Sequence, residues 1–453
     1  MEFYGKRTLR GLIDEDKKTK PSPTHLSFKT HQEMLEPNPQ FMSPTRHSSP
    51  SMISFFPPSP ESPWTLSPLH TTPSPSLLYH CVASLHRHDG NIFSIGVSRG
   101  MVFTGSQSSH IRLWQQQECV ERGYLKASSG EVRAILAYGN MLFTTHRDYK
   151  IRIWNISFSE NFRCKKITTL PQRSPFLLFQ RTNTHQHKDF ISCLAYYHAE
   201  GLLYTGSWDK TVKAWRVSDK KCVDSFVAHE DNVNAIVVNQ EDGCVFTCSS
   251  DGSVKIWRRV YMESSHTLTM ILKFQRSPVN ALALSLGSSK DSCFLYSGSS
   301  DGFINFWEKE KMSGRFNHGG FLDGHRFAVL CLVAVESLVF SGSEDTTIRV
   351  WRREEGSSFH GCLAVLDGHR GPVKCLTASL EVKKDFVMGF LVYSASLDQT
   401  FKVWRIRVLP EEKKIDSDTE RYDQRIKIMG YEMISPVLSP SWVKKKIQGN
   451  HLQ

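Results

Sequence analysis

The sequence predicts an all-β fold, a seven-bladed β-propeller with disordered N-terminal and C-terminal tails. A hairpin pattern that ends in tryptophan occurs seven times along the chain. Its copies are at least 40 residues apart, which is the length of one four-stranded propeller blade. The segments before and after the seven copies differ from them in composition. The segment before them is rich in serine and proline, and the segment after them mixes basic and acidic residues.

The N-terminal segment, residues 1–76, is predicted to be a disordered Ser/Pro-rich leader. It includes the stretch FMSPTRHSSPSMISFFPPSPESPWTLSPLHTTPSPS, in which proline recurs every few residues. Proline cannot donate a backbone hydrogen bond, and the apolar content is too low to offset the entropy of ordering the chain. The Ser-Pro and Thr-Pro pairs of this leader leave phosphorylation open as a means of regulation.

The propeller is predicted over residues 77–407. In each copy a strand leads to a Ser or Thr ten residues before the tryptophan, a tight turn follows, and an alternating strand ends at the tryptophan. An aspartate stands six residues before the tryptophan in every copy except the first. The copies are FTGSQSSHIRLW to Trp114, FTTHRDYKIRIW to Trp154, YTGSWDKTVKAW to Trp215, FTCSSDGSVKIW to Trp257, YSGSSDGFINFW to Trp307, FSGSEDTTIRVW to Trp351 and YSASLDQTFKVW to Trp404.

These copies resemble the WD-repeat family, in which an upstream histidine, the Ser/Thr, the Asp and the Trp form a hydrogen-bonded tetrad inside each blade. The resemblance implies four complete tetrads: His187–Thr205–Asp209–Trp215, His229–Thr247–Asp251–Trp257, His325–Ser341–Asp345–Trp351 and His369–Ser394–Asp398–Trp404. Ser108 replaces the Asp of the first copy, and Ser128 and Gln275 replace the His of the second and fifth. Those three blades are expected to be less rigid.

A ring of seven blades must also be closed. No complete fourth strand is evident after Trp404, so residues 78–86 are predicted to supply the outer strand of the last blade and to remove its exposed edge. Two insertions, 160–186 and 378–390, form either longer hairpins or extra docking elements. Residues 408–453, with basic and acidic side chains mixed, are predicted to be mostly disordered.

Bulk properties favour a soluble intracellular protein. The net charge is +11 and the pI is about 9.0, which indicates a mildly basic surface. The N-terminus has no apolar region typical of a secretory signal, and the longest apolar runs are too short to span a bilayer. The 11 cysteines form no CxxC pair, which favours reduced thiols over a disulfide framework or a zinc site.

The chain is predicted not to be an enzyme and to need no cofactor or metal. Asp, His and Ser recur together at one spacing beside a core tryptophan, whereas a catalytic nucleophile would be unique and exposed, with its own base and oxyanion hole. No Walker A, GxSxG, HExxH, EF-hand or GxGxxG motif is present. Five of the 19 histidines are repeat anchors, which accounts for their abundance without a metal.

The predicted partner site lies on the narrow top face of the propeller. By the geometry of the WD-repeat family, three positions in each blade point there: the residues on either side of the Ile or Val after the histidine, and the residue before the turn Asp. In blades 1 to 3 they include side chains typical of interface hot spots, namely Phe93, Arg133, Arg147, Phe190 and Trp208. We expect a partner peptide with apolar and acidic groups to dock there. The alternative is that Phe190 and Trp208 merely pack on each other.

Four segments look like the plant JINGUBANG group of WD-repeat proteins: YTGSWDKTVKAWRVSDKKCVDSFVAHEDNVNAIV, SGSSDGFINFWE, LDGHRFAVLCLVAVESLVFSGSEDTTIRVWRR and GHRGPVKCLTA. That resemblance implies a regulatory scaffold, a monomeric propeller in the plant cytoplasm and also the nucleus, that binds transcription factors or signalling proteins. One alternative is a substrate receptor of a cullin-type ubiquitin ligase, although no blade tryptophan is followed by the Asp that such receptors often carry. Another is a nucleic-acid or chromatin-associated propeller.

Overall fold

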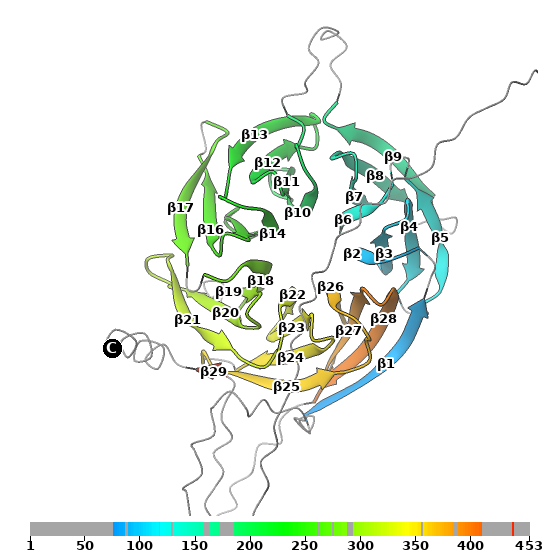
Figure 1. Ribbon diagram of the computed structural model, residues 1–453, viewed down its shortest axis with the longest axis vertical. Coiled ribbons are helices and arrows are strands. Elements are labelled where there is room, and N and C mark those ends of the chain that lie inside the picture. The colour runs from blue at the N-terminus through cyan, green and yellow to red at the C-terminus, as the bar shows by residue number, and fades with distance from the viewer. Residues whose placement is uncertain are drawn as a thin grey trace, which may run out of the picture. The chain divides into compact units, whose positions relative to one another are not determined.

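The computed structural model describes residues 76–86, 89–116, 118–127, 130–157, 163–172, 185–260, 263–273, 276–287, 293–354, 357–384, 387–409 and 437–438. These residues form seven antiparallel sheets arranged as blades around one axis, and they contain no helix (Figure 1). The predicted seven-bladed all-β fold is confirmed. The predicted leader, residues 1–76, lies outside the described residues except for Ser76.

Each blade runs from an inner strand beside the axis to an outer strand at the rim. Blade 1 consists of β2 (Ile92–Ser98), β3 (Met101–Ser106), β4 (His110–Gln115) and β5 (Glu121–Lys126). Blade 2 consists of β6 (Val132–Tyr138), β7 (Met141–His146), β8 (Ile151–Ser157) and β9 (Arg163–Leu170). Blade 3 consists of β10 (Ile191–Tyr197), β11 (Leu202–Ser207), β12 (Thr211–Arg216) and β13 (Lys221–Val227). Blade 4 consists of β14 (Val233–Val238), β15 (Val245–Ser249), β16 (Val254–Arg259) and β17 (His266–Leu272).

The remaining blades follow the same order until the last. Blade 5 consists of β18 (Val279–Leu286), β19 (Cys293–Ser299), β20 (Ile304–Lys309) and β21 (Phe316–Leu322), with β29 (Val437–Leu438) added to its outer edge. Blade 6 consists of β22 (Val329–Val335), β23 (Leu338–Ser343), β24 (Ile348–Arg353) and β25 (His360–Leu366). Blade 7 consists of β26 (Val373–Lys384), β27 (Val387–Ser396), β28 (Thr400–Val408) and β1 (Leu77–His86).

The two ends of the propeller sequence meet in blade 7. β1 pairs antiparallel with β28, so that Leu77 lies opposite Val408 and His86 lies opposite Thr400. The segment 78–86 is therefore the outer strand of the last blade, and the ring is closed by hydrogen bonds between residues more than 300 positions apart.

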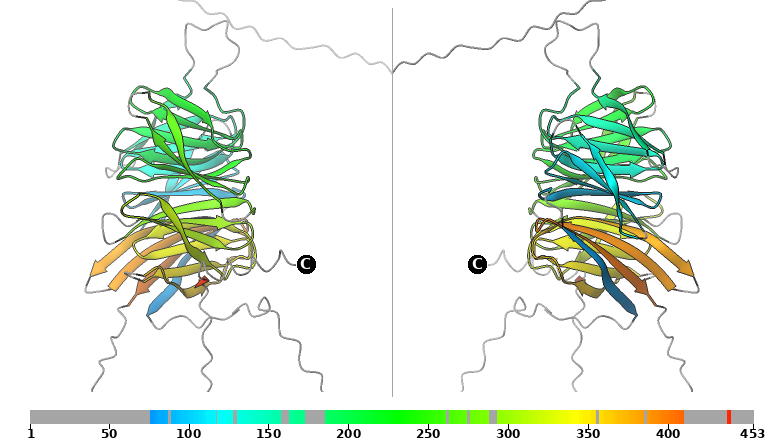
Figure 2. Two further views of the ribbon diagram at one scale, coloured as in Figure 1. Left: turned by 90° about the vertical axis from the view of Figure 1, so that its left-hand side faces the viewer. Right: turned by 90° about the vertical axis from the view of Figure 1, so that its right-hand side faces the viewer.

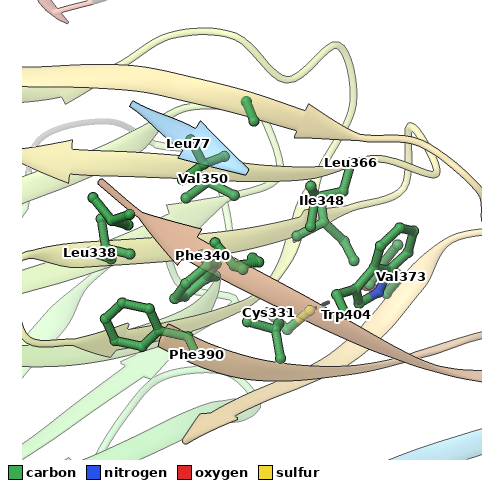
Figure 3. Packing of buried hydrophobic residues seen from close by; sticks show 14 residues of the cluster. Leu77, Cys331, Leu338, Phe340, Ile348, Val350, Leu366, Val373, Phe390 and Trp404 are labelled. Carbon is green, nitrogen blue, oxygen red and sulfur yellow. Dashed lines mark hydrogen bonds between the residues drawn. The ribbon is translucent and has the colours of Figure 1, made fainter. Parts of the chain in front are cut away.

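The hydrophobic core consists of seven clusters, each located between two consecutive blades. The cluster between blades 6 and 7 brings Phe340 and Val350 against Phe390 and Trp404 (Figure 3). Another unites Trp114 of blade 1 with Phe401 of blade 7 and completes the circle. Each blade tryptophan packs against the preceding blade. The tryptophan that recurs in the sequence is therefore the wedge that fills the space between neighbouring sheets.

The two insertions differ in what they add. Residues 163–170 of the first insertion form β9, the outer strand of blade 2, while 173–184 lie outside the described residues. The second insertion lengthens β26 and β27 into a paired hairpin, in which Ser379 lies opposite Leu391 and Lys384 lies opposite Val387. In edge view the blade 7 strands extend past the other blades (Figure 2). Within the described residues, no helix is long and apolar enough to cross a membrane.

Candidate functional site

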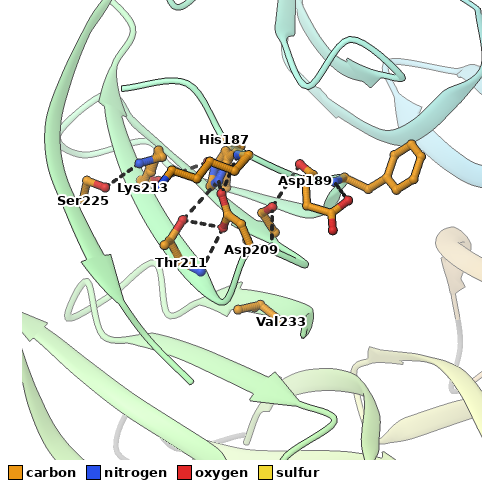
Figure 4. A network of polar contacts seen from close by, with 12 residues as sticks. His187, Asp189, Asp209, Thr211, Lys213, Ser225 and Val233 are labelled. Atoms are coloured by element: carbon orange, nitrogen blue, oxygen red, sulfur yellow. Dashed lines mark hydrogen bonds and ion pairs between the residues drawn. The ribbon is translucent and has the colours of Figure 1, made fainter. Parts of the chain in front are cut away.

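The tetrad of blade 3 is a continuous chain of hydrogen bonds, and Figure 4 shows the part of it around His187 and Asp209. Trp215 Nε1 donates to Thr205 Oγ1 over 3.1 Å, and that hydroxyl lies 2.8 Å from His187 Nε2. His187 Nδ1 lies 2.9 Å from Asp209 Oδ2. Because the indole can only donate and an ionised carboxylate can only accept, the hydroxyl donates to Nε2 and the ring donates from Nδ1. This direction of the bonds corresponds to a neutral imidazole and an ionised carboxylate.

Burial and hydrogen bonding support these protonation states. Burial lowers the pKa of His187 and thereby favours its neutral ring. Burial alone raises the pKa of Asp209, but the hydrogen bonds from His187, Thr211 and the backbone N–H of Lys188 outweigh it and hold that pKa well below its usual range. Thr205 is fully buried, so the network joins loop, turn and strands inside the blade.

The structure repeats this geometry in the three other complete tetrads. Three distances describe each tetrad: from His Nδ1 to the carboxylate, from His Nε2 to the hydroxyl, and from the indole nitrogen to the hydroxyl. They are 2.9, 2.8 and 3.0 Å in His229–Thr247–Asp251–Trp257. They are 2.8, 2.7 and 2.9 Å in His325–Ser341–Asp345–Trp351, and 3.1, 2.7 and 2.8 Å in His369–Ser394–Asp398–Trp404.

The sequence analysis missed a fifth member of the tetrads. A hydroxyl two residues after each Asp donates to its Oδ1 over 2.6 Å, from Thr211, Ser253, Thr347 and Thr400. The recurring Asp-x-Ser/Thr in these four copies is the signal that could have revealed it.

Blade 2 replaces the missing histidine from inside its own strand. His146 Nε2 lies 2.8 Å from Thr144 Oγ1, which accepts from Trp154 Nε1 over 2.9 Å. His146 is fully buried, and burial together with the nearby charge of Arg152 lowers its pKa to about 3. The other six copies have Ser at this position, so the exchange is visible in FTTHRD. Sequence reasoning looked for the imidazole only in the preceding loop, at Ser128.

Blades 1 and 5 replace their missing tetrad residues only in part. In blade 1, Asp89 pairs with Arg112, while Ser108 Oγ accepts from the backbone N–H of His110 over 3.1 Å. In blade 5, Ser297 Oγ is buried without a hydrogen-bond partner among the described residues. A cavity of about 10 Å³ lies beside it and is lined by Ser297 and Trp307, close to the smallest volume that holds one water molecule. Whether these blades are less rigid stays a prediction.

The tetrads fix the loops of the top face. In six blades, the residue before the turn Asp, or before Ser108 in blade 1, donates its backbone N–H to a carbonyl in the preceding loop, as Trp208 does to Phe190 over 3.0 Å. The remaining five pairs are Gln107 to Asn91, Ser250 to Asn232, Ser300 to Pro278, Glu344 to Ala328 and Leu397 to Pro372. In these six blades the top-face backbone is thus built to one plan, and their side chains distinguish them.

A β-bulge places one further top-face residue in every blade. The pairing of each inner strand skips the residue after its first Ile or Val: Phe93, Arg133, Ser192, Asn234, Asn280, Leu330 and Lys374. A bulge re-aims a side chain out of the alternation of the strand. Some of these side chains join neighbouring blades, as when Asn234 Nδ2 donates to the carbonyl of Val279 over 2.9 Å.

Four of the five predicted partner-site residues come together across blades 1 to 3. The guanidinium carbon of Arg133 lies 4.7 Å from the ring centre of Phe93, 4.3 Å from that of Phe190 and 6.0 Å from that of Trp208. Phe190 and Trp208 also meet edge to face, with centres 5.5 Å apart. The predicted alternative, packing of these two rings, is therefore present. It does not hide the site, because Trp208 keeps 37% of its surface exposed.

Charged groups surround this aromatic cluster. Glu131 Oε1 accepts from Arg133 Nε over 3.1 Å and from Nη2 over 2.9 Å. Arg147 is exposed and makes no ring contact with the cluster. On the opposite side of the ring, Phe327 is 58% exposed next to the exposed Arg326, a top-face feature that the family positions did not include.

Comparison with known families agrees with this architecture. A family model described as "WD domain, G-beta repeat" matches residues 179–216, 220–258, 266–308, 317–352 and 360–405. These five segments are therefore WD40 repeats. The five matched repeats fall in blades 3 to 7, and blades 1 and 2, whose tetrads are irregular, complete the WD40 ring in the structure.

Two curated WD40 relatives cover a shorter stretch. "Transducin beta-like protein 3" of Homo sapiens is 26% identical over 156 residues, or 32% of this chain and 18% of that protein. The Mus musculus protein of the same name is 28% identical over 153 residues, or 32% of this chain and 19% of that protein. The match thus spans less than a fifth of either relative.

WD40 propellers are typically non-enzymatic scaffolds that bind proteins. Within the described ranges, no group of three or more His, Cys, Asp or Glu side chains is arranged to hold a metal ion. All 11 cysteines are free, and burial raises the pKa of several, for example that of Cys193 to about 12. Such thiols carry little thiolate at neutral pH.

Proposed function

We propose that this propeller is a non-enzymatic adaptor that binds a partner protein on its top face, at Phe93, Arg133, Arg147, Phe190 and Trp208. The observation that supports this most directly is the contact of the Arg133 guanidinium with rings from blades 1 and 3, beside the half-open face of Trp208. Aromatic and arginine side chains in rigid surroundings are the residue types that dominate binding energies.

The chemistry of the cluster suits a segment with apolar and acidic groups. The Arg133 edge formed by Nη1 and Nη2 keeps donors that Glu131 does not use, and a carboxylate can accept from two guanidinium nitrogens at once. Arg147 adds a second, exposed positive charge. The exposed ring of Trp208 offers apolar area close to that charge, so an acidic residue beside a large apolar one matches both features.

The test is affinity capture with the wild-type chain beside a Trp208→Ala/Arg147→Ala double variant. Phe359→Ala is a matched control, since Phe359 is 39% exposed and precedes β25 on the outer rim of blade 6. Partners that bind the wild type and the Phe359→Ala control but are lost from the double variant support the proposal. Partners retained equally by all three proteins refute the placement of the binding surface.

We further infer a regulatory role for this adaptor, acting as a monomer in plant signalling or transcription, in the cytoplasm and also in the nucleus. The resemblance of four segments to the JINGUBANG group supports this finer assignment. Localisation of the tagged chain in plant cells tests the compartments. Binding that falls steeply with salt and is competed by DNA would instead favour the nucleic-acid alternative.

A further inference from the structure

The face opposite the tetrad loops carries an aromatic cluster that the proposed function does not use. The inner strands β6, β10 and β14 begin at the tetrad loops and end at the opposite face, and they lie side by side around the central opening (Figure 1). Tyr138 ends β6, and Tyr196 and Tyr197 end β10, with His198 next in the turn. We call these four residues the tyrosine cluster.

The rings of the tyrosine cluster form a stepped surface across blades 2 and 3. Tyr138 and His198 stack nearly parallel, with centres 5.9 Å apart and planes 16° apart. Tyr196 lies against Tyr138 at 5.2 Å and 54°, and Tyr197 contacts His198 at 6.4 Å and 61°. Tyr138 is 41% exposed and His198 is exposed, so faces and edges of the rings are open to solvent.

Blade 4 holds this surface in position through Gln240. Its Oε1 lies 2.6 Å from His198 Nδ1 and accepts from the His198 backbone N–H over 3.3 Å, while its Nε2 donates to the carbonyl of Tyr196 over 2.8 Å. The carbonyl oxygen of Gln240 can only accept, so His198 donates from Nδ1 and leaves Nε2 as an acceptor. A ring held in this way loses little conformational freedom when a ligand binds.

The polar groups of the cluster remain available to a ligand. The hydroxyls of Tyr138, Tyr196 and Tyr197 make no hydrogen bond with any residue in the described part of the chain. The adjacent turn of blade 4 packs against Tyr197, since a Cβ built on Gly243 would lie 3.1 Å from that ring. This turn presents Glu241, whose side chain is exposed. The surface therefore combines flat rings, free phenol donors and one negative charge.

We propose that the tyrosine cluster binds a proline-rich segment of a partner protein in the polyproline II conformation, with a Lys or Arg of that segment beside Glu241. The proline rings of such a segment pack on aromatic side chains, and its backbone carbonyls, which make no internal hydrogen bonds, can accept from the tyrosine hydroxyls. Its stiffness keeps the entropic cost of binding low. A positive charge in the segment complements the exposed carboxylate of Glu241. This site uses other residues, another face and another ligand chemistry than the adaptor site.

The test uses the full chain and fluorescence anisotropy with a labelled synthetic peptide, one arginine followed by three Ala-Pro-Pro repeats. We expect saturable binding that Tyr138→Ala weakens by about tenfold or more, as for other exposed aromatic anchors. Tyr138→Phe, which keeps the ring and removes the hydroxyl, should weaken binding only a few-fold. Trp208→Ala on the opposite face should leave it unchanged, and circular dichroism verifies that each variant is folded.

Two further arms test the ligand chemistry. A peptide with glycine in place of every proline should fail to bind, and Glu241→Gln should weaken binding of the arginine peptide while leaving that of an uncharged analogue unchanged. Absence of saturable binding, equal binding of the glycine peptide, or indifference to Tyr138→Ala would each overturn the proposal. Self-association of the wild type that disappears in Tyr138→Ala would assign the surface to a second copy of the chain and overturn it as well. None of the outcomes that would overturn this proposal depends on Trp208 or Arg147, so the adaptor proposal is judged separately.

Discussion

Completing the tetrad of blade 5 should stabilise the propeller. Gln275 stands four residues before Val279, as His369 stands four residues before Val373, and both loops continue with Arg and with Pro before the Val. Ser297 and Asp301 already occupy the positions of the tetrad hydroxyl and carboxylate, and a cavity lies beside Ser297. Gln275→His therefore supplies the ring that the blade 5 tetrad lacks, although Phe303 stands where the complete tetrads have their fifth member, a hydroxyl.

The magnitude follows from the bonds made by His369. Its ring reaches Ser394 Oγ over 2.7 Å and Asp398 Oδ2 over 3.1 Å. A neutral hydrogen bond contributes about 1 kcal/mol and one to a charged group about 1.5–3 kcal/mol, from which ordering the ring subtracts about 1 kcal/mol. We expect a gain of about 2 kcal/mol. With an unfolding entropy of about 2.1 cal/mol/K per residue over roughly 330 residues, Tm should rise by about 3 °C.

The gain should also depend on pH in a defined direction. Burial raises the pKa of Asp301, whereas hydrogen bonds from the Thr400 hydroxyl and from the backbone N–H groups of Arg370 and Thr400 outweigh burial and hold the pKa of Asp398 at about 2. Burial lowers the pKa of His369. In the completed tetrad the new histidine, buried like His369, should have a folded-state pKa below that of the unfolded chain. The added stability is therefore present near pH 7 and is lost as the pH falls below about 6.5, where the unfolded histidine binds a proton.

The assay is urea unfolding of the full chain, followed by tryptophan fluorescence at pH 7 and pH 5. The same substitution in a Ser297→Ala/Asp301→Asn background is the matched control, because both partners of the new ring are then removed. An equal gain in that background would show that the stabilisation arises elsewhere. Absence of any gain in the wild-type background would refute the assignment of blade 5 as an incomplete tetrad.

Three further predictions concern the tetrads and turns. Thr205→Val leaves Trp215 Nε1 and His187 Nε2 buried without a partner and should lower the free energy of unfolding by about 3 kcal/mol. Ser297→Ala removes a hydroxyl that has no partner among the described residues, so the same denaturation assay should show almost no change in stability. The pKa of His146 is about 3 in the folded chain and about 6.5 when unfolded, so lowering the pH from 7 to 5 should cost about 2 kcal/mol at this residue, and His146→Gln should remove that part of the pH dependence of the urea midpoint. Gly302 has a φ of +89°, and a Cβ there would lie 2.7 Å from the carbonyl oxygen of His325. Gly100 has a φ of +76° but open space around it, so Gly302→Ala should lower Tm more than Gly100→Ala. Equal effects on Tm would contradict the steric reasoning.

The fold was accessible from the sequence because one physical unit recurs. A buried tryptophan, a β-branched strand and a turn aspartate occur at fixed spacing, and only the stacking of neighbouring blades buries such units. The same regularity located the four tetrads, since each of their residues has one role at one position. It did not reveal His146, because the compensating imidazole comes from a strand position that holds serine in the other copies.

The partner site was accessible only in part. Phe93 and Arg133 meet because a bulge in each inner strand re-aims one residue, and the family geometry already contains that bulge. Phe190 and Trp208 come from the loop and the turn of blade 3, which a backbone hydrogen bond joins. The tyrosine cluster was not foreseen, because it depends on turns of three blades whose sequences share no motif. Its rings come together through Gln240, a contact between residues 42 positions apart that no local pattern encodes.

Closure of the ring by β1 has a consequence for biosynthesis. Leu77 leaves the ribosome early, but its partner Val408 is translated more than 300 residues later. At about 5–20 residues per second, the first-made strand waits roughly 15–65 s for the chain that will cover it. During that interval blade 1 exposes the surface of Trp114 that Phe401 later covers, a target for chaperones that bind apolar nascent chains. When the chain is expressed without such chaperones, we therefore expect folding to fail at blade 7, where β1 pairs with β28, rather than at blade 1.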